Sequence, residues 1–199
     1  LDVADYFNQL FTTPDSADWG SDDRATLFFG IGRDTDLFHG CCRRYGEIRG
    51  EEAVNPLIRA YATGGPDLRR DSVAALGRIG SERAVATIIA ASGDESPDVR
   101  LSAIRAMGWT RDARVLPALL PFLQNPDPAV RFEAVRAIHP YSGQKTDLLL
   151  TRALGDPDAG IRREAARQVG RRGVAAAVQP LVGLFEDPDT AVRKAAARA

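Results

Sequence analysis

Apolar residues recur along the chain at helical spacing, and the whole pattern returns every 31 residues. In one unit Val99, Ala103 and Met107 share one face of a helix, and a second apolar stripe follows between residues 115 and 123. Each unit therefore predicts a hairpin of two helices. Because one hairpin cannot bury its own apolar faces, we expect the units to stack into an all-α superhelix, a solenoid that is right-handed or curved. The apolar residue that opens the first helix recurs without insertions as Leu37, Leu68, Val99, Val130, Ile161 and Val192.

Turn residues mark the ends of these predicted helices. Asp-Pro-Asp at 156–158 and 187–189, and Asn-Pro-Asp at 125–127, precede first helices and predict capping side chains in a rigid turn. A glycine closes the first-helix pattern at positions 46, 77, 108 and 170, where the fourth unit has His139. We expect this glycine to end the first helix in a left-handed conformation.

The repeats predict one continuous domain over residues 34–199, with about five full units and a final half unit. Residues 1–33 lack the repeat and contain two apolar patches separated by an acidic stretch, which predicts an N-terminal helical cap. The last unit has a first helix and no second. Either that helix caps the solenoid or the native protein continues.

The repeated pattern D-P-D-x-x-V-R-x-x-A-x-x-x-L-G-x-x-G, carried by 96–108 and 187–196, resembles the HEAT-like repeats of the phycobilisome (PBS) lyase family. The resemblance covers residues 34–199 and implies a HEAT-like α-solenoid. For function it implies a bilin lyase subunit or bilin chaperone that acts on phycobiliproteins, with a bilin as the ligand. No residue matches a motif that is specific to the lyases rather than to the repeat, so the resemblance is specific for the fold and not for the function.

Composition and charge exclude several classes of protein. With 26 basic and 27 acidic residues and 44% apolar residues, the chain is neither disordered, collagenous, a disulfide scaffold nor a coiled coil. No apolar run approaches the roughly 18 residues that cross a bilayer, so we expect a cytoplasmic protein. All but two of the basic residues are arginines, and few aromatic residues accompany them, which disfavours nucleic acid as the partner. The charge is bipolar, because residues 1–36 are strongly acidic and residues 161–199 are basic.

Arginines form two columns that follow the repeat. The first predicts a structural ladder of ion pairs between the loops of adjacent units, and the alternative is an anion-binding ladder. The second predicts a solvated outer face, and the alternative is a basic stripe for an acidic protein surface, a phosphate or nucleic acid. The first column is Arg69, Arg100, Arg131, Arg162 and Arg193, and the second is Arg43, Arg105, Arg136, Arg167 and Arg198.

The turn between the two helices departs from the repeat in the third and fourth units. Where other units have Gly-x-x-Gly, the third unit has residues 108–111 and the fourth has residues 139–143. We expect Trp109, His139 and Tyr141 from these turns to lie near one another along one edge of the solenoid. Arg78, one repeat before Trp109, and Arg171, two repeats after it, occupy the same position of the repeat. Such a cluster suits a protein hot spot or a flat conjugated ligand, whereas the alternative is a bulky turn that only fills space.

Residues that could support catalysis or metal binding do not form a known pattern. The adjacent Cys41 and Cys42 fall on buried positions and predict a structural role, and neither His39 nor His139 is followed by the glutamate of a His-Glu metal pair. We expect Glu133 and Glu164 to be solvated helix positions. The sequence therefore predicts no catalytic residue, no metal and no cofactor of its own.

These observations favour a protein-binding scaffold or adaptor that uses the concave second-helix face and the turn edge. Small or apolar second-helix positions such as Ala86, Pro117 and Gly183 suit a helix or loop, and the arginines suit an acidic surface. Such a protein would form a hetero-oligomer with its partner.

The first alternative is the bilin lyase subunit or bilin chaperone, and the protein would be an enzyme only in the case of the lyase subunit. In this alternative Arg105, Arg136 and Trp109 contact the propionates and rings of the bilin, and His139 or Tyr141 assists. The second is a fragment of a larger regulator. The candidate partner-binding residues are Trp109, His139, Tyr141, Arg105, Arg136, Arg167, Arg78 and Arg171.

Overall fold

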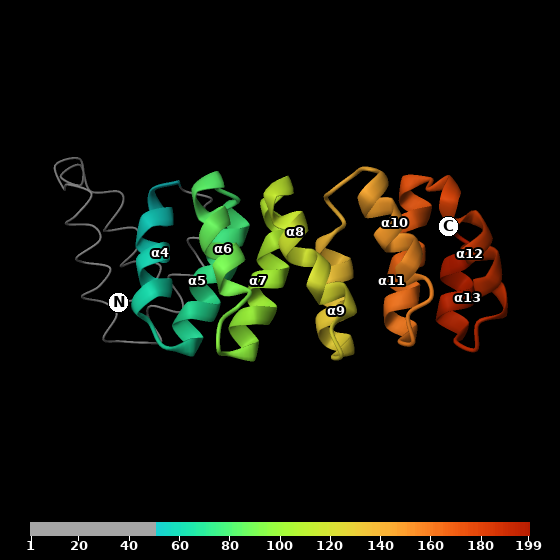
Figure 1. Cartoon of the computed structure of the whole chain (residues 1–199), viewed down its shortest axis with the longest axis horizontal. Helices are drawn as coiled ribbons and strands as arrows, with labels where there is room; N and C mark the ends of the chain where they lie inside the picture. The colour runs from blue at the N-terminus through green and yellow to red at the C-terminus, as the bar shows by residue number, and fades with distance from the viewer. Residues whose placement is uncertain (1–50) are drawn as a thin grey trace, which may run out of the picture.

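Helices stand side by side in a row that is two layers deep (Figure 1). This computed structural model describes residues 51–199, which contain no strand, and so confirms an all-α repeat solenoid. The proposed cap at 1–33, the unit around Leu37 and the cysteines lie outside the described residues. The first-helix layer consists of α5 (Pro66–Ile79), α7 (Pro97–Thr110), α9 (Pro128–Ala137), α11 (Ala159–Arg172) and α13 (Thr190–Ala196). The second-helix layer consists of α4 (Val54–Thr63), α6 (Val85–Ala91), α8 (Leu116–Leu119), α10 (Gln144–Ala153) and α12 (Val178–Gly183).

Short 3-10 turns lie beside most helices of the second layer. They lead into α4, α6, α8 and α12 and continue α8 and α12 at their ends. Proline residues at 117, 121 and 180 fall in or next to these segments, and proline lacks the N–H that a longer α-helix needs. The turns are η2 (Glu51–Ala53), η3 (Glu82–Ala84), η4 (Ala113–Val115), η5 (Leu120–Gln124), η6 (Ala175–Ala177) and η7 (Leu184–Glu186).

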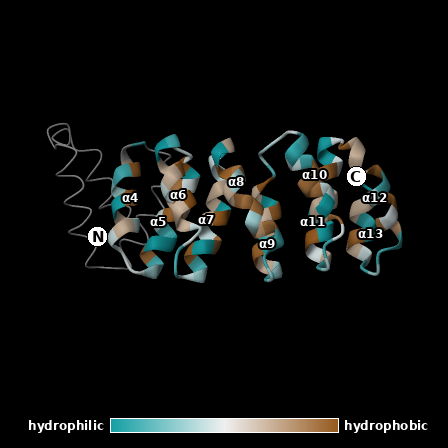
Figure 2. Ribbon diagram, in the orientation of Figure 1, coloured by the Kyte–Doolittle hydropathy of each residue, from teal (hydrophilic) through white to brown (hydrophobic). Residues whose placement is uncertain are grey.

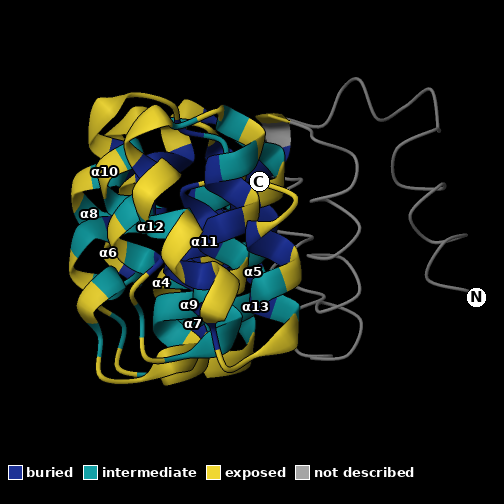
Figure 3. Ribbon diagram, turned by 90° about the vertical axis from the view of Figure 1, so that its right-hand side faces the viewer, coloured by how far each residue is buried: buried dark blue, intermediate teal, exposed yellow. Residues whose placement is uncertain are grey.

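The hydrophobic core runs along the row between the two layers. Hydrophobic residues line the facing sides of the helices (Figure 2), and the view from the end of the row shows buried positions between the layers (Figure 3). The apolar positions of the repeat, such as Val99, Met107 and Leu119, are fully buried. Within residues 51–199 no helix combines the length and the apolar character that a membrane span requires.

Aspartates cap the first helices as the turn pattern predicts. Asp127 accepts a hydrogen bond from the backbone N–H of Ala129 at 2.8 Å, and Asp158 accepts one from Ile161 at 3.0 Å. Asp189 accepts two, from Ala191 and Val192. These side chains satisfy N–H groups that the first turn of a helix leaves unpaired.

The recurrent glycine does not end the first helix, so that prediction was wrong. Gly77 and Gly108 lie inside α5 and α7, and both helices end in a left-handed residue three positions later, Gly80 at φ 71° and Arg111 at φ 57°. The glycine instead permits close helix packing. A Cβ atom on Gly77 would lie 2.5 Å from the Cβ of Ala106 on the next first helix, far below van der Waals contact.

The fourth unit breaks this close packing. His139 replaces the glycine, and Pro140 after it ends α9 at Ala137, because a residue before proline disfavours the helical conformation. Arg172 of α11 donates hydrogen bonds to the carbonyls of Ile138 and His139 at 2.9 and 3.0 Å. It thereby caps the C-terminal end of the shortened helix.

A buried glutamine crosses the same α9–α11 contact. Gln168 takes the register of Ala106 and Ala137, is 0% exposed, and donates from Nε2 to the carbonyl of Val135 at 3.0 Å. Its Oε1 finds no hydrogen-bond partner in the described part of the chain. The packing of α9 on α11 therefore includes a fully buried polar side chain, which the repeat pattern does not predict.

The first arginine column forms the predicted ladder of ion pairs. Arg162 donates from Nε and Nη2 to both carboxylate oxygens of Asp187 in the next loop, at 2.7 and 2.8 Å. Its Nη1 donates to backbone carbonyls of its own loop. Arg69 forms the same bidentate ion pair with Asp94, and Arg131 forms it with Asp156. All three nitrogens of each of these guanidinium groups donate hydrogen bonds within the protein, which favours the structural ladder over the anion-binding alternative.

Candidate functional site

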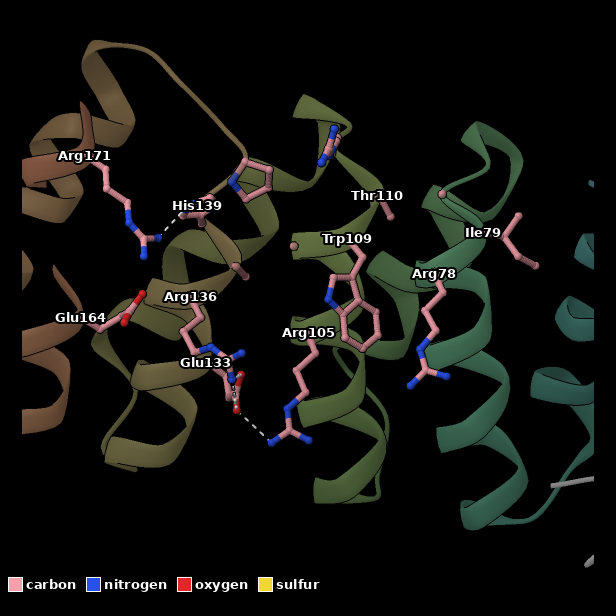
Figure 4. Close-up of a pocket in the computed structure, with 15 residues that line it drawn as sticks. Arg78, Ile79, Arg105, Trp109, Thr110, Glu133, Arg136, His139, Glu164 and Arg171 are labelled. Carbon is pink, nitrogen blue, oxygen red and sulfur yellow. Dashed lines mark hydrogen bonds and ion pairs between the residues drawn. The ribbon is translucent and has the colours of Figure 1, made fainter. Parts of the chain in front are cut away.

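A hollow of about 1050 Å³ lies along the turn edge of the first-helix layer (Figure 4). It extends over four repeats, from α5 through α7 and α9 to α11. Five arginines line it against two glutamates, so its walls carry positive charge: Arg78, Arg105, Arg111, Arg136 and Arg171 with Glu133 and Glu164. The hollow is cationic because the second arginine column and the turn arginines converge there.

Six of the eight predicted site residues line this hollow. They are Arg78, Arg105, Trp109, Arg136, His139 and Arg171. The repeat brings them together because residues in one register lie on the same edge of successive helices. Arg167 lies outside the lining and binds Glu164 at 3.2 Å.

Tyr141 is the predicted site residue that the structure removes. It is 5% exposed, and its hydroxyl donates to the carbonyl of Met107 and lies 3.1 Å from the hydroxyl of Thr110. Tyr141 occupies the same position of the repeat as Ile79 and Thr110. Its ring points inward and packs in the hydrophobic core beside the shortened α9. Burial raises the pKa of its phenol. Tyr141 therefore stabilises the junction of two repeats and cannot contact a partner.

Trp109 presents an aromatic surface to solvent within the hollow. Its side chain comes from α7 and is 44% exposed, so that much of the ring is open to a ligand. The guanidinium carbon of Arg78 on α5 lies 5.5 Å from the ring centroid, within range of a cation–π interaction. The two side chains face each other in Figure 4. Together they form the flat, cationic end of the hollow.

Glu133 is buried at the centre of the hollow, which contradicts the expectation of a solvated position. It is 7% exposed and accepts hydrogen bonds from Arg105 at 2.9 Å and from Arg136 at 3.3 Å. Its place on α9 turns it toward α7, where Arg105 of the preceding repeat covers it. The two central arginines thus share one carboxylate of the chain itself.

The arginines at the ends of the hollow have no such carboxylate. Arg78 on α5 and Arg171 on α11 form no ion pair with any residue in 51–199, and neither does Arg111, which follows α7 beside Trp109. Arg171 points toward His139, with its Nη1 3.4 Å from the imidazole Nε2 (Figure 4). The arginines that form no ion pair in this part of the chain are therefore one at each end of the hollow and Arg111 beside Trp109.

The second-helix layer exposes the small residues that the sequence singled out, among them Ala86, Ala90, Pro117, Pro121 and Gly183. Larger apolar side chains, such as Val182 and Phe185, are half exposed there as well. The hollow nevertheless lies in the first-helix layer. The turn edge, rather than the second-helix face, is the site where charge, an aromatic side chain and a concave shape coincide.

Groups that could hold a metal ion are absent from residues 51–199, where no three histidine, cysteine, aspartate or glutamate side chains cluster suitably. His139 has a backbone turn and an arginine as its neighbours. The chemistry that this arrangement offers is ion pairing and stacking. Anionic groups can be bound at the ends of the hollow and an apolar or flat group on Trp109.

Comparisons with known proteins agree with the fold. The family model for HEAT repeats matches residues 85–149 and 146–199, and the model for the PBS lyase HEAT-like repeat matches residues 68–94. A search of curated proteins gave no match. Among solved structures, the Escherichia coli protein YIBA_ECOLI is similar with a TM-score of 0.66 and 19% identity, over 98% of this chain and 73% of that one.

Two further structures extend this comparison. A designed armadillo repeat protein in complex with the peptide (KR)4 has a TM-score of 0.60 and 18% identity, over 83% of this chain and 92% of that one. The complex of CpcE and CpcF of phycocyanin lyase from Nostoc sp. PCC7120 has a TM-score of 0.48 and 22% identity, over 81% and 87%. At these identities the likeness concerns the fold. With the family model matching more than half of its length, the chain belongs to the HEAT repeat family.

Proposed function

We propose that the protein is a binding module, without catalysis of its own, whose turn-edge hollow receives an acidic part of another protein. The observation that carries this proposal is the coincidence of five arginines with a half-exposed tryptophan in one hollow. Arginine and tryptophan dominate the binding energy of protein interfaces, because they combine large contact areas with charge or stacking. The complex would be a hetero-oligomer.

The scaffold supports this role because its repeats are held rigidly. Two-pronged ion pairs such as Arg162–Asp187 join successive loops, and the contact of Gly77 with Ala106 joins successive first helices. A surface that is ordered before binding loses less entropy when the partner arrives. The hollow is therefore suited to recognition by preorganised side chains.

Nucleic acid fits this hollow less well than protein. A polynucleotide carries a phosphate at every residue, and two of the lining residues, Glu133 and Glu164, would repel it. Of the lining residues only Trp109 and His139 offer an aromatic ring to a base. An acidic protein surface can instead place its carboxylates where the arginines are open.

A bilin is the second candidate ligand. The PBS lyase HEAT-like repeat at 68–94 includes Arg78, and Arg105, Arg136 and Trp109 line the same hollow. Arginines would pair with the two propionates and Trp109 would stack on a pyrrole ring, with His139 beside them. Adding a bilin to the protein should then change the visible absorption spectrum. An unchanged spectrum would exclude this candidate.

Site-specific cross-linking tests the principal proposal. A photoreactive amino acid replaces Trp109 in one variant and the exposed Gln179, on α12 of the second layer, in another. After irradiation in native lysate, we expect a protein adduct from position 109 and none from position 179. Adducts from position 179 alone would contradict the proposal.

A charge-reversal pair makes this experiment specific. Arg78→Glu with Arg171→Glu should abolish the adduct from position 109, because the open cations attract the partner. Arg152→Glu with Arg163→Glu makes the same change of charge at two exposed arginines outside the hollow and should leave the adduct intact. Equal loss in both pairs would indicate non-specific attraction.

A further inference from the structure

Some arginines of the hollow pair with a glutamate of the chain and others do not. This difference determines which kind of partner segment fits the hollow. This step rests on the proposed function, since it names the class of partner segment for the same hollow. At the centre, Arg105 and Arg136 share the buried Glu133. A partner carboxylate placed there would compete with Glu133 for both arginines, whereas Arg78 and Arg171 have no carboxylate of residues 51–199 as a partner. Carboxylates of the partner are therefore bound more favourably at the ends than at the centre.

The two ends of the hollow are separated by three repeats. Arg78 and Arg171 share one register position on α5 and α11, and two helices, α7 and α9, lie between (Figure 1). Packed helices are about 8–10 Å apart, so the two arginines span roughly 25–30 Å. An extended chain advances about 3.3–3.6 Å per residue, and about seven to nine residues bridge that span.

Trp109 lies at an asymmetric place along this span. It holds the register of Arg78 and Arg171, one repeat from the first and two repeats from the second. With about 10 Å per repeat, the residue that reaches Trp109 is about three residues from one acidic end of the segment. Its half-exposed ring, backed by the Arg78 guanidinium, favours an apolar side chain there.

We infer that the hollow binds an extended, acidic peptide segment of about ten residues, with carboxylates at both ends, few in the middle, and an apolar side chain about three residues from one end. Arg78 and Arg171 bind the terminal carboxylates, and Arg111, beside Trp109, adds a third open cation. The central Arg105–Glu133–Arg136 cluster contacts the neutral middle of the segment. This distribution of carboxylates along the segment follows from which arginines of the hollow already pair with Glu133.

The experiment uses fluorescein-labelled decapeptides and fluorescence anisotropy with the full chain. The first peptide has two glutamates at each end, leucine in the fourth position and glycine and serine elsewhere, and the second is its reversed sequence. The third has the same composition with its four glutamates in the middle. Because a segment can lie in either direction, one of the first two peptides should bind at least tenfold more tightly than the third.

Variants locate the contact. Arg78→Gln and Arg171→Gln should each weaken binding of that peptide at least fivefold, and Trp109→Ala should weaken it several-fold. Arg152→Gln, on the second layer, should leave binding unchanged. All four side chains are exposed or line the hollow, and thermal unfolding should confirm that the variants remain folded.

Several outcomes would overturn the inference. They are equal binding of the centre-acidic peptide, binding of neither end-acidic peptide, equal weakening by Arg152→Gln, or tighter binding of a labelled ten-nucleotide oligothymidine. If a protein cross-links at position 109 while neither end-acidic peptide binds, the proposed function stands and the segment pattern fails. If position 109 yields no cross-link, the proposed function itself fails.

Discussion

Arg162 binds Asp187 through two parallel hydrogen bonds of 2.7 and 2.8 Å, and the pair joins the loops of two successive repeats. Both side chains are largely shielded from water. The Arg162 guanidinium holds the pKa of the Asp187 carboxyl below its ordinary value of 3.8, with a smaller contribution from the backbone N–H of Asp189. The ion-pair ladder is thus one source of the solenoid's stability.

Removing this charge should destabilise the fold. We expect Asp187→Asn to lower the free energy of unfolding by about 1–3 kcal/mol, because Arg162 loses a charge-assisted partner in a shielded place. Urea unfolding measures the change. The matched control is Asp127→Asn at an exposed helix cap, where asparagine caps as well as aspartate and the change should stay within about 0.5 kcal/mol.

Acid provides a second readout of the same pair. A carboxyl whose pKa is lowered on folding stabilises the protein above its ordinary pKa, and this contribution is lost as the pH falls through the folded value. The stability difference between the native protein and Asp187→Asn should therefore be full at pH 6 and shrink as the pH falls below about 4. A difference that did not change with pH would show that the ion pair is not its cause.

One position of the ion-pair ladder lacks its carboxylate, and a substitution can supply it. Arg100 holds the register of Arg69, Arg131 and Arg162, but its partner position has Asn125 instead of an aspartate. Among residues 51–199, Arg100 donates to the carbonyls of Asp94 and Glu95 and forms no ion pair. We expect Asn125→Asp to raise the free energy of unfolding by about 0.5–1 kcal/mol. No gain, or the same gain when Arg100 is also changed to glutamine, would contradict the assignment of this rung.

Glycine at the contact between first helices should tolerate no side chain. Gly77→Ala would place its Cβ 2.5 Å from that of Ala106 and 2.6 Å from the Ala106 Cα, and we expect a loss of about 1–3 kcal/mol. Gly183→Ala makes the same substitution on exposed α12, where no atom beyond the adjacent backbone lies within 4 Å of the new Cβ, and should instead gain up to about 1 kcal/mol. Thermal unfolding of the two variants should show shifts of opposite sign.

Tyr141 should matter for stability and not for binding. Tyr141→Phe keeps the buried ring and removes the hydroxyl that bonds to Met107 and Thr110, and we expect it to cost about 1 kcal/mol. Affinity for the end-acidic peptide should stay unchanged. If Tyr141→Phe instead weakened peptide binding and left unfolding unaltered, Tyr141 would belong to the binding site.

The repeat, the capped turns and the ion-pair ladder could be predicted because each follows from one register of one repeat. Gly77 was misread because a glycine near the end of a helix is equally compatible with a cap and with a close contact. The sequence does hold a signal for the contact, since an alanine follows Gly77 and Gly108 after 29 residues, as Ala106 and Ala137. In the fourth unit the corresponding pair is His139 and Gln168.

The site was predicted in part for a similar reason. Trp109, Arg78 and Arg171 share one register, and the structure places all three along the hollow. The inward turn of Tyr141 and the burial of Glu133 depend on how α9 packs after Pro140 shortens it, which no register reveals. Which arginines are already paired therefore needed three-dimensional coordinates.

Backbone chemical-shift mapping by NMR tests the central claim most directly, because it locates the binding surface without a variant. The isotope-labelled protein is titrated with the end-acidic decapeptide that binds more tightly. We predict the largest shifts at the turn edge, in residues 78–80, 105–111, 136–140 and 171, with little change in residues 178–186 of the second layer. Shifts concentrated in α6, α8, α10 and α12, with an unperturbed turn edge, would contradict the account.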